Sequence, residues 1–460
     1  LIIGEIGKLK RGEFSDDLLP SVVNNMKLDF FRSLQVNDSR ADMFTDAFIN
    51  GKEWGDVVNR LNRISAMTKQ QIVDFACKYL NDNYVCVYKE QGEDSTLKKI
   101  EKPAITPIPT NRDMSSNFLQ EVSNMKTQPI EPKFVDYKKD LTITSTKSKL
   151  PMLYKQNTDD DLFYLTFHYD FGSESDNAIN LAPDYLYYIG TDKKTSAQVK
   201  QEFYKLACSY MINVSADEIN VSLTGLNENL KPALALLEDL MNNAKGDRES
   251  YDKYVSLLLK SRDDSKKNQR SNFGYLQSYG MYGPYNNLLN TLSDKQLRDA
   301  DPQMLPDRLK KLNGIEHTVL YYGPYSEKEI SAVISKLHKT AKKLTPVPEG
   351  KKYAGQLTPQ NEVLIAPYEA KNIYMMQYHN ENLKWNPEEE PVRALFNEYF
   401  GGSMNGIVFQ ELREARGLAY SAFADYSTPW RKGDPEYFYT YIISQNDKMG
   451  DCIKVFNNIL

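Results

Sequence analysis

One order of local signals occurs twice in this chain, and this repeat constrains the fold most strongly. Thr68-Lys69-Gln70-Gln71 and Ser293-Asp294-Lys295-Gln296 both fit a capping box, in which Thr or Ser is followed three residues later by Gln. A helix and then a strand rich in β-forming residues follow each box, with the strands at residues 84–88 and 317–322. The boxes start about 225 residues apart, far beyond the ~20–50 residues of a solenoid repeat. The repeat indicates two duplicated α/β domains, and chance similarity of helix–strand units is the alternative.

Length and charge narrow the class of protein. The chain has 460 residues, which is enough for two to four domains at ~100–200 residues each. Its 57 Lys and Arg are outnumbered by 62 Asp and Glu, so the formal net charge is −5, and no basic block occurs. This mild acidity argues against nucleic acid as the main partner. No stretch approaches the ~18 consecutive apolar residues of a transmembrane helix, so we expect no membrane span.

The metal-binding residue types are too scattered for a local metal site. The four cysteines lack C-x-x-C spacing: Cys77, Cys86, Cys208 and Cys452. The four histidines are equally dispersed: His168, His317, His338 and His379. The closest two are about 21 residues apart, whereas a helical two-His zinc site needs i, i+3 or i, i+4 spacing. We therefore expect no such site to be built by this chain alone.

Both ends of the chain resemble the interior of a longer one. Residue 1 is Leu, and the opening residues lack the order of a signal peptide. The last ten residues place Cys452, Val455, Phe456 and Ile459 on one face of an amphipathic helix that has no terminating signal. We expect a fragment of a longer protein, whose targeting signals could lie elsewhere. The compartment stays open, and the tyrosine-rich, cysteine-poor composition is compatible with a bacterial periplasm or cell envelope.

Composition changes divide the chain into four segments. Residues 1–95 alternate amphipathic helices with polar turns, and residues 96–140 combine recurrent Pro with clustered Lys and Glu, as in an extended linker. Residues 141–345 form an α/β block, and residues 346–460 form another. The expected fold class is α+β, built from repeated two-layer α/β sandwich domains.

The pattern of apolar residues predicts the main elements of the two later blocks. We expect strands at residues 162–169, 218–226, 362–367, 372–379, 420–426 and 437–444. We expect helices around residues 181–189, 196–212, 230–244, 249–270 and 302–312. Gly401-Gly402 is expected to end a helix in the left-handed conformation. The tyrosines at 275, 279, 282 and 285 are expected to pack in a core or between domains.

The most informative run extends from Gly401 to Tyr420. Arg413 lies near the end of a predicted helix, Tyr420 opens the next strand, and Gly417 lies between them. Such a turn can aim both side chains into one cleft. Arg offers a fork of donors to a peptide carbonyl, and the Tyr hydroxyl can donate to a developing oxyanion. The alternative is a surface Arg beside a half-buried Tyr.

This run resembles the substrate-binding segment of the pitrilysin/insulin-degrading-enzyme family of zinc metallopeptidases, the inverted zincins. Its members carry Arg and Tyr seven residues apart, at the end of a helix–turn–strand in the last of four homologous domains, and Arg413 and Tyr420 match that spacing. The resemblance covers essentially the whole chain. It implies the end of domain two (1–95), a linker (96–140), all of domain three (141–345) and the first part of domain four (346–460).

The resemblance also implies a mechanism. Zinc would be held in domain one, outside this chain, by a helix carrying H-x-x-E-H, whose Glu is the general base. Domain four would close over domain one like a clamshell. Arg413 and Tyr420 would then bind the substrate carbonyl and stabilise the tetrahedral intermediate. The implied partners are peptide substrates and the N-terminal half of the same polypeptide.

Domain three departs from the family's active pattern. Where the zinc helix would carry H-x-x-E-H, this chain has Leu181-Ala182-Pro183-Asp184-Tyr185. No His is left, and a lone Asp cannot hold zinc. We therefore expect a decayed copy that binds no zinc, and no metal or cofactor site in this chain.

Three hypotheses from different classes follow. The first is the non-catalytic C-terminal part of a zinc-dependent metalloendopeptidase that degrades peptides in a closed chamber. The second is a catalytically inactive structural or assembly subunit of the same family, and the third is a peptide-binding module without chemistry. The presence of both Arg413 and Tyr420 favours the first, because a scaffold has no use for the pair.

Overall fold

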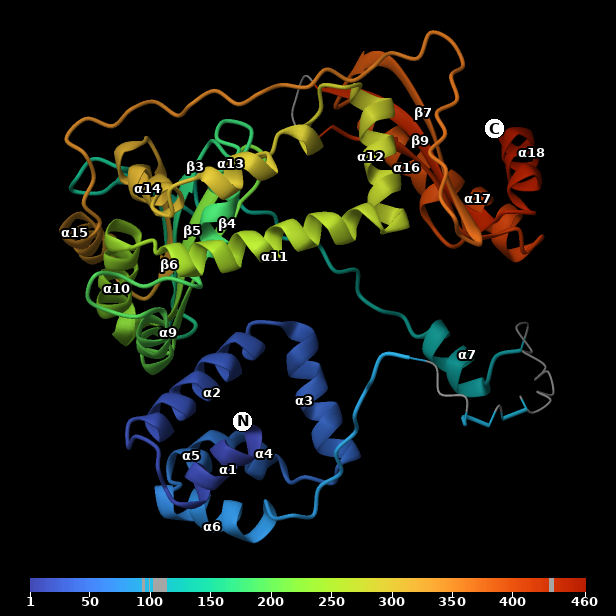
Figure 1. Cartoon of the computed structure of the whole chain (residues 1–460). Coiled ribbons are helices and arrows are strands. Elements are labelled where there is room, and N and C mark those ends of the chain that lie inside the picture. The colour runs from blue at the N-terminus through green and yellow to red at the C-terminus, as the bar shows by residue number, and fades with distance from the viewer. Residues whose placement is uncertain (93–95, 99, 102–113, 430–433) are drawn as a thin grey trace. The chain divides into compact units, whose positions relative to one another are not determined.

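A computed structural model describes the chain except for residues 93–95, 99, 102–113 and 430–433. The described residues divide into two compact units, Leu1–Thr142 and Ile143–Leu460, which we treat separately. Figure 1 labels many of their elements. The mixture of helices and sheets confirms the predicted α+β class.

Helices are the only regular secondary structure that the structure describes between Leu1 and Asp140. Its helices are α1 (Ile2–Lys10), α2 (Leu18–Leu34), α3 (Asn37–Ile49), α4 (Trp54–Val58), α5 (Arg60–Ser65), α6 (Lys69–Tyr79) and α7 (Asn117–Asn124). The capping box before α6 is confirmed, because the Thr68 hydroxyl accepts from the Gln71 amide and the Gln71 side chain accepts from the Thr68 amide. Helix α7 lies in the predicted linker, much of whose Pro-rich part falls outside the described residues.

The strand predicted at residues 84–88 is wrong. The segment is not in a strand, and Val85 and Val87 are 90% and 87% exposed. β-forming residues need a neighbouring strand to pair with. Between Leu1 and Asp140 the described residues contain no strand, so the segment has no such neighbour.

The second unit begins with a six-stranded sheet in the order β1-β2-β6-β3-β5-β4. Its strands are β1 (Thr142–Ser145), β2 (Pro151–Gln156), β3 (Leu162–Tyr169), β4 (Cys208–Val214), β5 (Ile219–Leu226) and β6 (Thr318–Gly323). β2 pairs with β6 in parallel, and β3 is antiparallel to β5 and β6. The strand predicted at 162–169 is confirmed, and its alternate residues are buried as the sheet period requires.

The helix predicted over residues 196–212 is wrong in its second half. α9 (Ser196–Lys205) ends early, Ala207 adopts a φ of 45°, and β4 begins at Cys208. Every residue of β4 pairs with β5, from Cys208 opposite Gly225 to Val214 opposite Ile219. A sheet neighbour has therefore overridden a pattern that suits either a helix or a strand.

Helices and short turns pack around the six-stranded sheet of the second unit and share one continuous core with it. They are α8 (Ala182–Leu186), α10 (Leu230–Asn243), α11 (Arg248–Lys266), α13 (Asp294–Asp299), α14 (Met304–Lys311) and α15 (Glu327–Leu337). Leu234 and Leu237 of α10 pack with Phe163 and Leu165 of β3, all at most 1% exposed. The capping box at Ser293 is confirmed before α13.

A three-stranded antiparallel sheet in the order β7-β9-β8 carries the rest of the unit. Its strands are β7 (Asn372–Lys384), β8 (Ala419–Ser427) and β9 (Pro435–Gln445). α16 (Glu390–Asn397), a π-helical turn (Glu398–Gly402), α17 (Ile407–Phe409), a second π-helical turn (Gln410–Glu414) and α18 (Met449–Ile459) accompany it. The strand predicted at 362–367 is wrong: the segment is unpaired, with Val363 and Ile365 both 81% exposed.

The tyrosine-rich stretch belongs largely to α12 (Gln269–Tyr282). This helix contacts the three-stranded sheet through Phe273, whose ring meets that of Tyr374 edge-on at 5.7 Å. Tyr275, Tyr279 and Tyr285 are 48%, 49% and 58% exposed. These three tyrosines therefore lie outside the core, contrary to the expectation that they pack in one.

Candidate functional site

Arg413 lies on an irregular helical turn rather than on a regular α-helix. Residues Gln410–Glu414 form a π-helical turn, closed by the Ala415 amide donating to the Gln410 carbonyl at 2.8 Å. A π turn inserts one extra residue per turn, and such turns are frequent at functional sites because they re-aim side chains. The direction of the Arg413 side chain is therefore set by this wider turn.

A turn at Gly417, held by hydrogen bonds, carries the chain from the helix into β8. Gly417 has a φ of +57°, a conformation that costs Gly little. Its amide donates to the Arg413 carbonyl at 3.0 Å, and the Leu418 amide donates to the Leu412 carbonyl at 2.8 Å. The Ser444 hydroxyl of β9 donates to the Leu418 carbonyl at 2.5 Å. These bonds fix the turn between the two candidate residues.

Tyr420 lies at a bulge in β8. Ala419 pairs with Ser444 and Ser421 with Ile443, so Tyr420 is the extra residue with no partner position on β9. A bulge turns the side chain of its extra residue away from the regular alternation of the strand. The Tyr420 side chain is 79% exposed as a result, and its hydroxyl has no hydrogen-bond partner among the described residues.

The two candidate side chains meet. The guanidinium carbon of Arg413 lies 5.2 Å from the ring centroid of Tyr420 and 4.8 Å from that of Phe409. Both rings are within the distance at which a guanidinium is attracted to an aromatic face, and its N–H groups can still donate hydrogen bonds. The structure thus brings Arg413 and Tyr420 together, and their role in substrate binding stays a prediction.

The neighbouring arginine is in a different situation. Arg416 forms an ion pair with Glu411, which also accepts from it through its backbone carbonyl at 3.1 Å. Among the residues that the structure describes, the carboxylate contact of Arg413 is a long one of 3.9 Å, from its Nε to Glu414 Oε1. Of the two arginines, Arg413 therefore has the guanidinium that is less engaged by a carboxylate.

The opposite side of this turn is anchored in a core. Val408 and Leu412 are fully buried with Phe456 of α18 and Ile442 of β9. Buried anchors on one face and the exposed pair on the other mean that the pair is presented by a fixed backbone. The site is an exposed cationic and phenolic surface on a rigid support.

Gly401 supports the same region for a reason that differs from the prediction. Neither Gly401 nor Gly402 has a positive φ, so the expected left-handed helix end is wrong. Gly401 instead lies against the backbone of Ala424 in β8, where a Cβ would come within 2.8 Å of the Ala424 Cα and closer still to its N and O. Only Gly permits this close approach of helix to strand.

The segment that would correspond to a zinc helix does not suit zinc. Residues Ala182–Leu186 form α8, in which Ala182 and Tyr185 are fully buried, and the Tyr185 hydroxyl donates to the Asp247 carbonyl at 3.1 Å. Asp184 is the one side chain of the run 181–185 that could bind zinc. Among the described residues, no group of three or more His, Cys, Asp or Glu is arranged to hold a metal ion. The expectation of a zinc-free chain stays a prediction.

One grouping of polar residues escaped the sequence analysis. His317 and His338 are about 21 residues apart in the sequence, yet their Nε2 atoms are 3.0 Å apart in the core. His338 also meets Glu238 of α10. No helical spacing joins the three, because the fold brings them together from α10, the residue before β6 and the end of α15.

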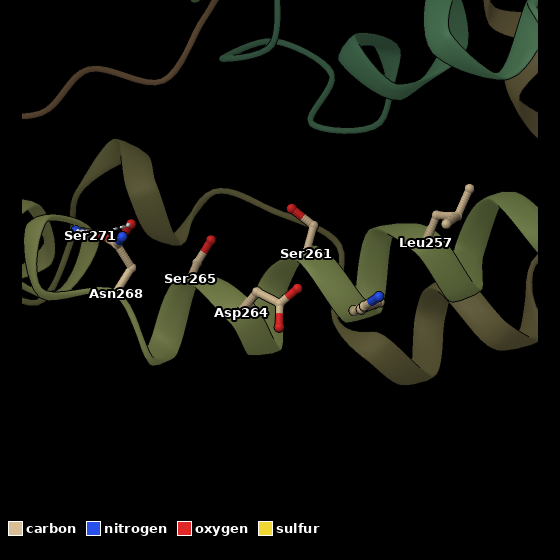
Figure 2. Close-up of a pocket in the computed structure, with 7 residues that line it drawn as sticks. Leu257, Ser261, Asp264, Ser265, Asn268 and Ser271 are labelled. Carbon is tan, nitrogen blue, oxygen red and sulfur yellow. Dashed lines mark hydrogen bonds between the residues drawn. The ribbon is translucent and has the colours of Figure 1, made fainter. Parts of the chain in front are cut away.

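A shallow hollow of about 460 Å³ also lies along the end of α11 and the start of α12 (Figure 2). Leu257, Lys260, Ser261, Asp264, Ser265, Asn268 and Ser271 line it. Neither Arg413 nor Tyr420 is among them, so the hollow is separate from the candidate pair.

Comparison with known proteins finds one family model that matches the C-terminal third of the chain. Residues 317–460 match the sequence model of the family described as the peptidase M16 inactive domain. The resemblance to the C-terminal portion of the pitrilysin-type, or M16, family is confirmed. A comparison with curated protein sequences returns no match.

Solved structures of M16 proteins share the fold. A peptidase M16 inactive domain from Pseudomonas fluorescens is 16% identical, with a TM-score of 0.54 over 70% of this chain and 78% of that one. The periplasmic protease PqqL from Escherichia coli is 13% identical, with a TM-score of 0.57 over 100% of this chain and 53% of that one. The ferredoxin protease FusC, solved with Arabidopsis ferredoxin, is 11% identical, with a TM-score of 0.58 over 99% of this chain and 53% of that one.

The chain therefore spans about half the length of these two proteases. None of the helices that the structure describes has the length and apolar character needed to cross a bilayer.

Proposed function

We propose that this chain is the non-catalytic C-terminal part of a zinc-dependent metalloendopeptidase, in which Arg413 and Tyr420 bind the peptide substrate. The observation that carries the proposal is the contact between the two side chains, with the guanidinium 5.2 Å from the phenol ring and the phenol exposed. Both side chains project from an exposed turn that backbone hydrogen bonds and the buried Val408 and Leu412 hold in place. The match to an M16 inactive domain supports the non-catalytic part of the proposal.

Each residue has a defined chemical task in this proposal. The N–H edge of Arg413 donates to the carbonyl oxygen of the peptide backbone, and the hydroxyl of Tyr420 donates to the same oxygen as it gains negative charge. Donors fixed in advance at this oxygen lower the barrier, because they need no reorganisation during the reaction. Phe409 and the turn at Gly417 hold the guanidinium in place.

The zinc belongs to residues outside this chain in the proposal. When bound, zinc would activate the water that attacks the peptide. The described residues of this chain do not assemble a site for it, so we assign them substrate binding and oxyanion stabilisation alone. The proposed partners are peptide substrates and the N-terminal half of the same polypeptide, and a periplasmic or envelope location is proposed by analogy with PqqL.

Substitution of Tyr420 by Phe in the full-length protein tests the proposal. The change keeps the ring beside Arg413 and removes only the hydroxyl, so kcat for peptide cleavage should fall by roughly 10–10³-fold. Zinc content, measured by metal analysis, should be unchanged. The matched control is Arg416→Ala, which removes an arginine already paired with Glu411 and should leave kcat within about twofold.

Three outcomes separate the hypotheses. Loss of turnover in Tyr420→Phe with normal zinc supports the proposal. Normal turnover in that variant removes Tyr420 from the mechanism. A full-length protein that cleaves no peptide and binds no zinc would instead be the inactive structural or assembly subunit.

A further inference from the structure

Three side chains in the core around the six-stranded sheet form a continuous polar chain. Glu238 of α10, His338 at the end of α15 and His317 before β6 are 9%, 2% and 5% exposed. His338 Nδ1 lies 2.7 Å from Glu238 Oε1, and the Nε2 atoms of the two histidines are 3.0 Å apart. His317 Nδ1 lies 2.7 Å from the Ile315 carbonyl oxygen. We call these three residues the histidine bridge.

The donors and acceptors of this arrangement do not match if both histidines are neutral and Glu238 is ionised. The Ile315 carbonyl can only accept, so His317 must carry its proton on Nδ1 and its Nε2 is an acceptor. If Glu238 is ionised, His338 must donate to it from Nδ1, and a neutral His338 would then present a second acceptor at Nε2. Two bare acceptors buried at 3.0 Å would repel.

One additional proton resolves the conflict. It makes His338 an imidazolium that donates to Glu238 from Nδ1 and to His317 from Nε2. The other placement, on the Glu238 carboxyl group, lets His338 donate only from Nε2 and needs the same single proton. Both placements therefore give the bridge one proton more than its three groups hold in an unfolded chain at neutral pH and above.

The surroundings favour the placement on His338. The ring of Phe167 stacks on the His338 ring at a centroid distance of 4.0 Å, which suits a cation over an aromatic face. His338 is also the C-terminal cap of α15, where the helix dipole attracts positive charge. The Asn242 amide donates to Glu238 Oε2 at 3.3 Å, which satisfies the second carboxylate oxygen.

The remaining groups around the bridge are neutral. Burial, and the charge of His338, lower the pKa of His317 to about 4, although its bond to Ile315 opposes the shift. His317 is then the uncharged acceptor that the bridge requires. Tyr169 of β3 faces His317 at 4.8 Å between ring centroids, and burial followed by the charge of Glu238 raises its pKa far above the usual value. Tyr169 therefore keeps its proton.

We propose that a single proton held between His317 and His338 completes the hydrogen bonds that join α10, α15 and β6. We further propose that the stability of the folded domain falls with rising pH because it depends on this proton. Above about pH 6.5, where unfolded histidines are neutral, folding takes up this proton. The unfolding equilibrium constant then rises tenfold for each pH unit, so the folded domain loses stability as the pH rises. This loss ends at the pH at which the folded bridge itself releases the proton.

Below about pH 6.5 the effect of pH is opposite, because stability then falls as the pH falls. The pKa of His317 is depressed in the fold, so its contribution is present above about 6.5 and is lost as the pH falls toward about 4. The bridge alone therefore gives greatest stability near pH 6.5.

The test is urea unfolding of the 460-residue chain between pH 6.5 and 9.0, with His317→Gln as the variant. A Gln amide can donate to the Nε2 of a neutral His338, so this change removes the need for the extra proton. The wild-type unfolding constant should rise more steeply with pH than that of the variant, by close to tenfold per unit. His379→Gln is the control, because His379 is an exposed histidine of β7, and it should keep the wild-type slope.

Equal slopes in the wild type and His317→Gln would overturn the proposal. If the variant does not fold, ¹⁵N NMR of the histidine side chains in the wild type decides. A His338 ring at pH 8 that is doubly protonated, or neutral with its proton on Nε2, supports the bridge, and two neutral rings with the His338 proton on Nδ1 contradict it. Stoichiometric binding of added zinc chloride that displaces this ring proton would also contradict it, because the two Nε2 atoms would then be metal ligands.

Discussion

Arg413 and Tyr420 are each set in place by a local departure from regular secondary structure. A π-helical turn aims the arginine, and a bulge aims the tyrosine. Their seven-residue spacing and the intervening Gly417 are visible in the sequence, so the pair could be predicted as a candidate. The turn and the bulge could not be predicted, because the sequence has no residue pattern that distinguishes a π-helical turn from an α-helix, and the bulge depends on pairing with β9.

Gly401 carries a prediction at the same scale. Gly401→Ala should destabilise the larger unit by about 1–3 kcal/mol, because the new methyl group would meet the backbone of Ala424, which cannot swing aside as a flexible side chain can. The free energy of unfolding, measured by urea titration, checks this.

The control at this scale is Gly450→Ala in α18, where a Cβ would meet nothing within 4 Å. That change should be neutral or stabilising, because Ala is the better helix former. A Gly401→Ala variant as stable as the wild type would show that the helix and β8 can separate without cost.

At the scale of elements, helices and strands were predicted best where their own residues carry the signal, such as a capping box or the period of apolar residues. The strand at 162–169, the capping boxes at Thr68 and Ser293 and the terminal amphipathic helix are all present. The predictions failed where neighbours decide. Residues 84–88 have no strand beside them, and residues 208–212 became a strand because β5 pairs with them.

Helix α18 gives the element-scale prediction. Phe456 is fully buried and meets Phe400 edge-on at 6.4 Å. Phe456→Ala should cost about 3–5 kcal/mol, because it leaves a cavity beneath the turn that carries Arg413. Thermal unfolding followed by circular dichroism measures the loss.

The neighbouring Asn457 is exposed and supplies the control. Asn457→Ala should change stability by no more than about 0.5 kcal/mol. Equal effects of the two substitutions would mean that α18 does not pack on the sheet as described.

At the scale of the whole molecule, the two units differ in how much core they hold. The two hydrophobic core clusters both lie within residues 150–456. In the first unit, Phe44, Phe48 and Phe75 are 60–88% exposed. The sequence predicted a fold class and a candidate pair, but it did not predict the histidine bridge, because no local spacing joins residues on three separate elements.

The central claim is that Arg413 and Tyr420 act on a substrate as one unit, and a double-mutant cycle on the full-length protein tests it most directly. The measured quantity is kcat/KM for peptide cleavage by the wild type, Arg413→Lys, Tyr420→Phe and the double variant. Groups that serve one oxygen atom are not additive. We predict a double variant little worse than the poorer single variant, with zinc content constant, and losses that simply multiply would contradict the claim.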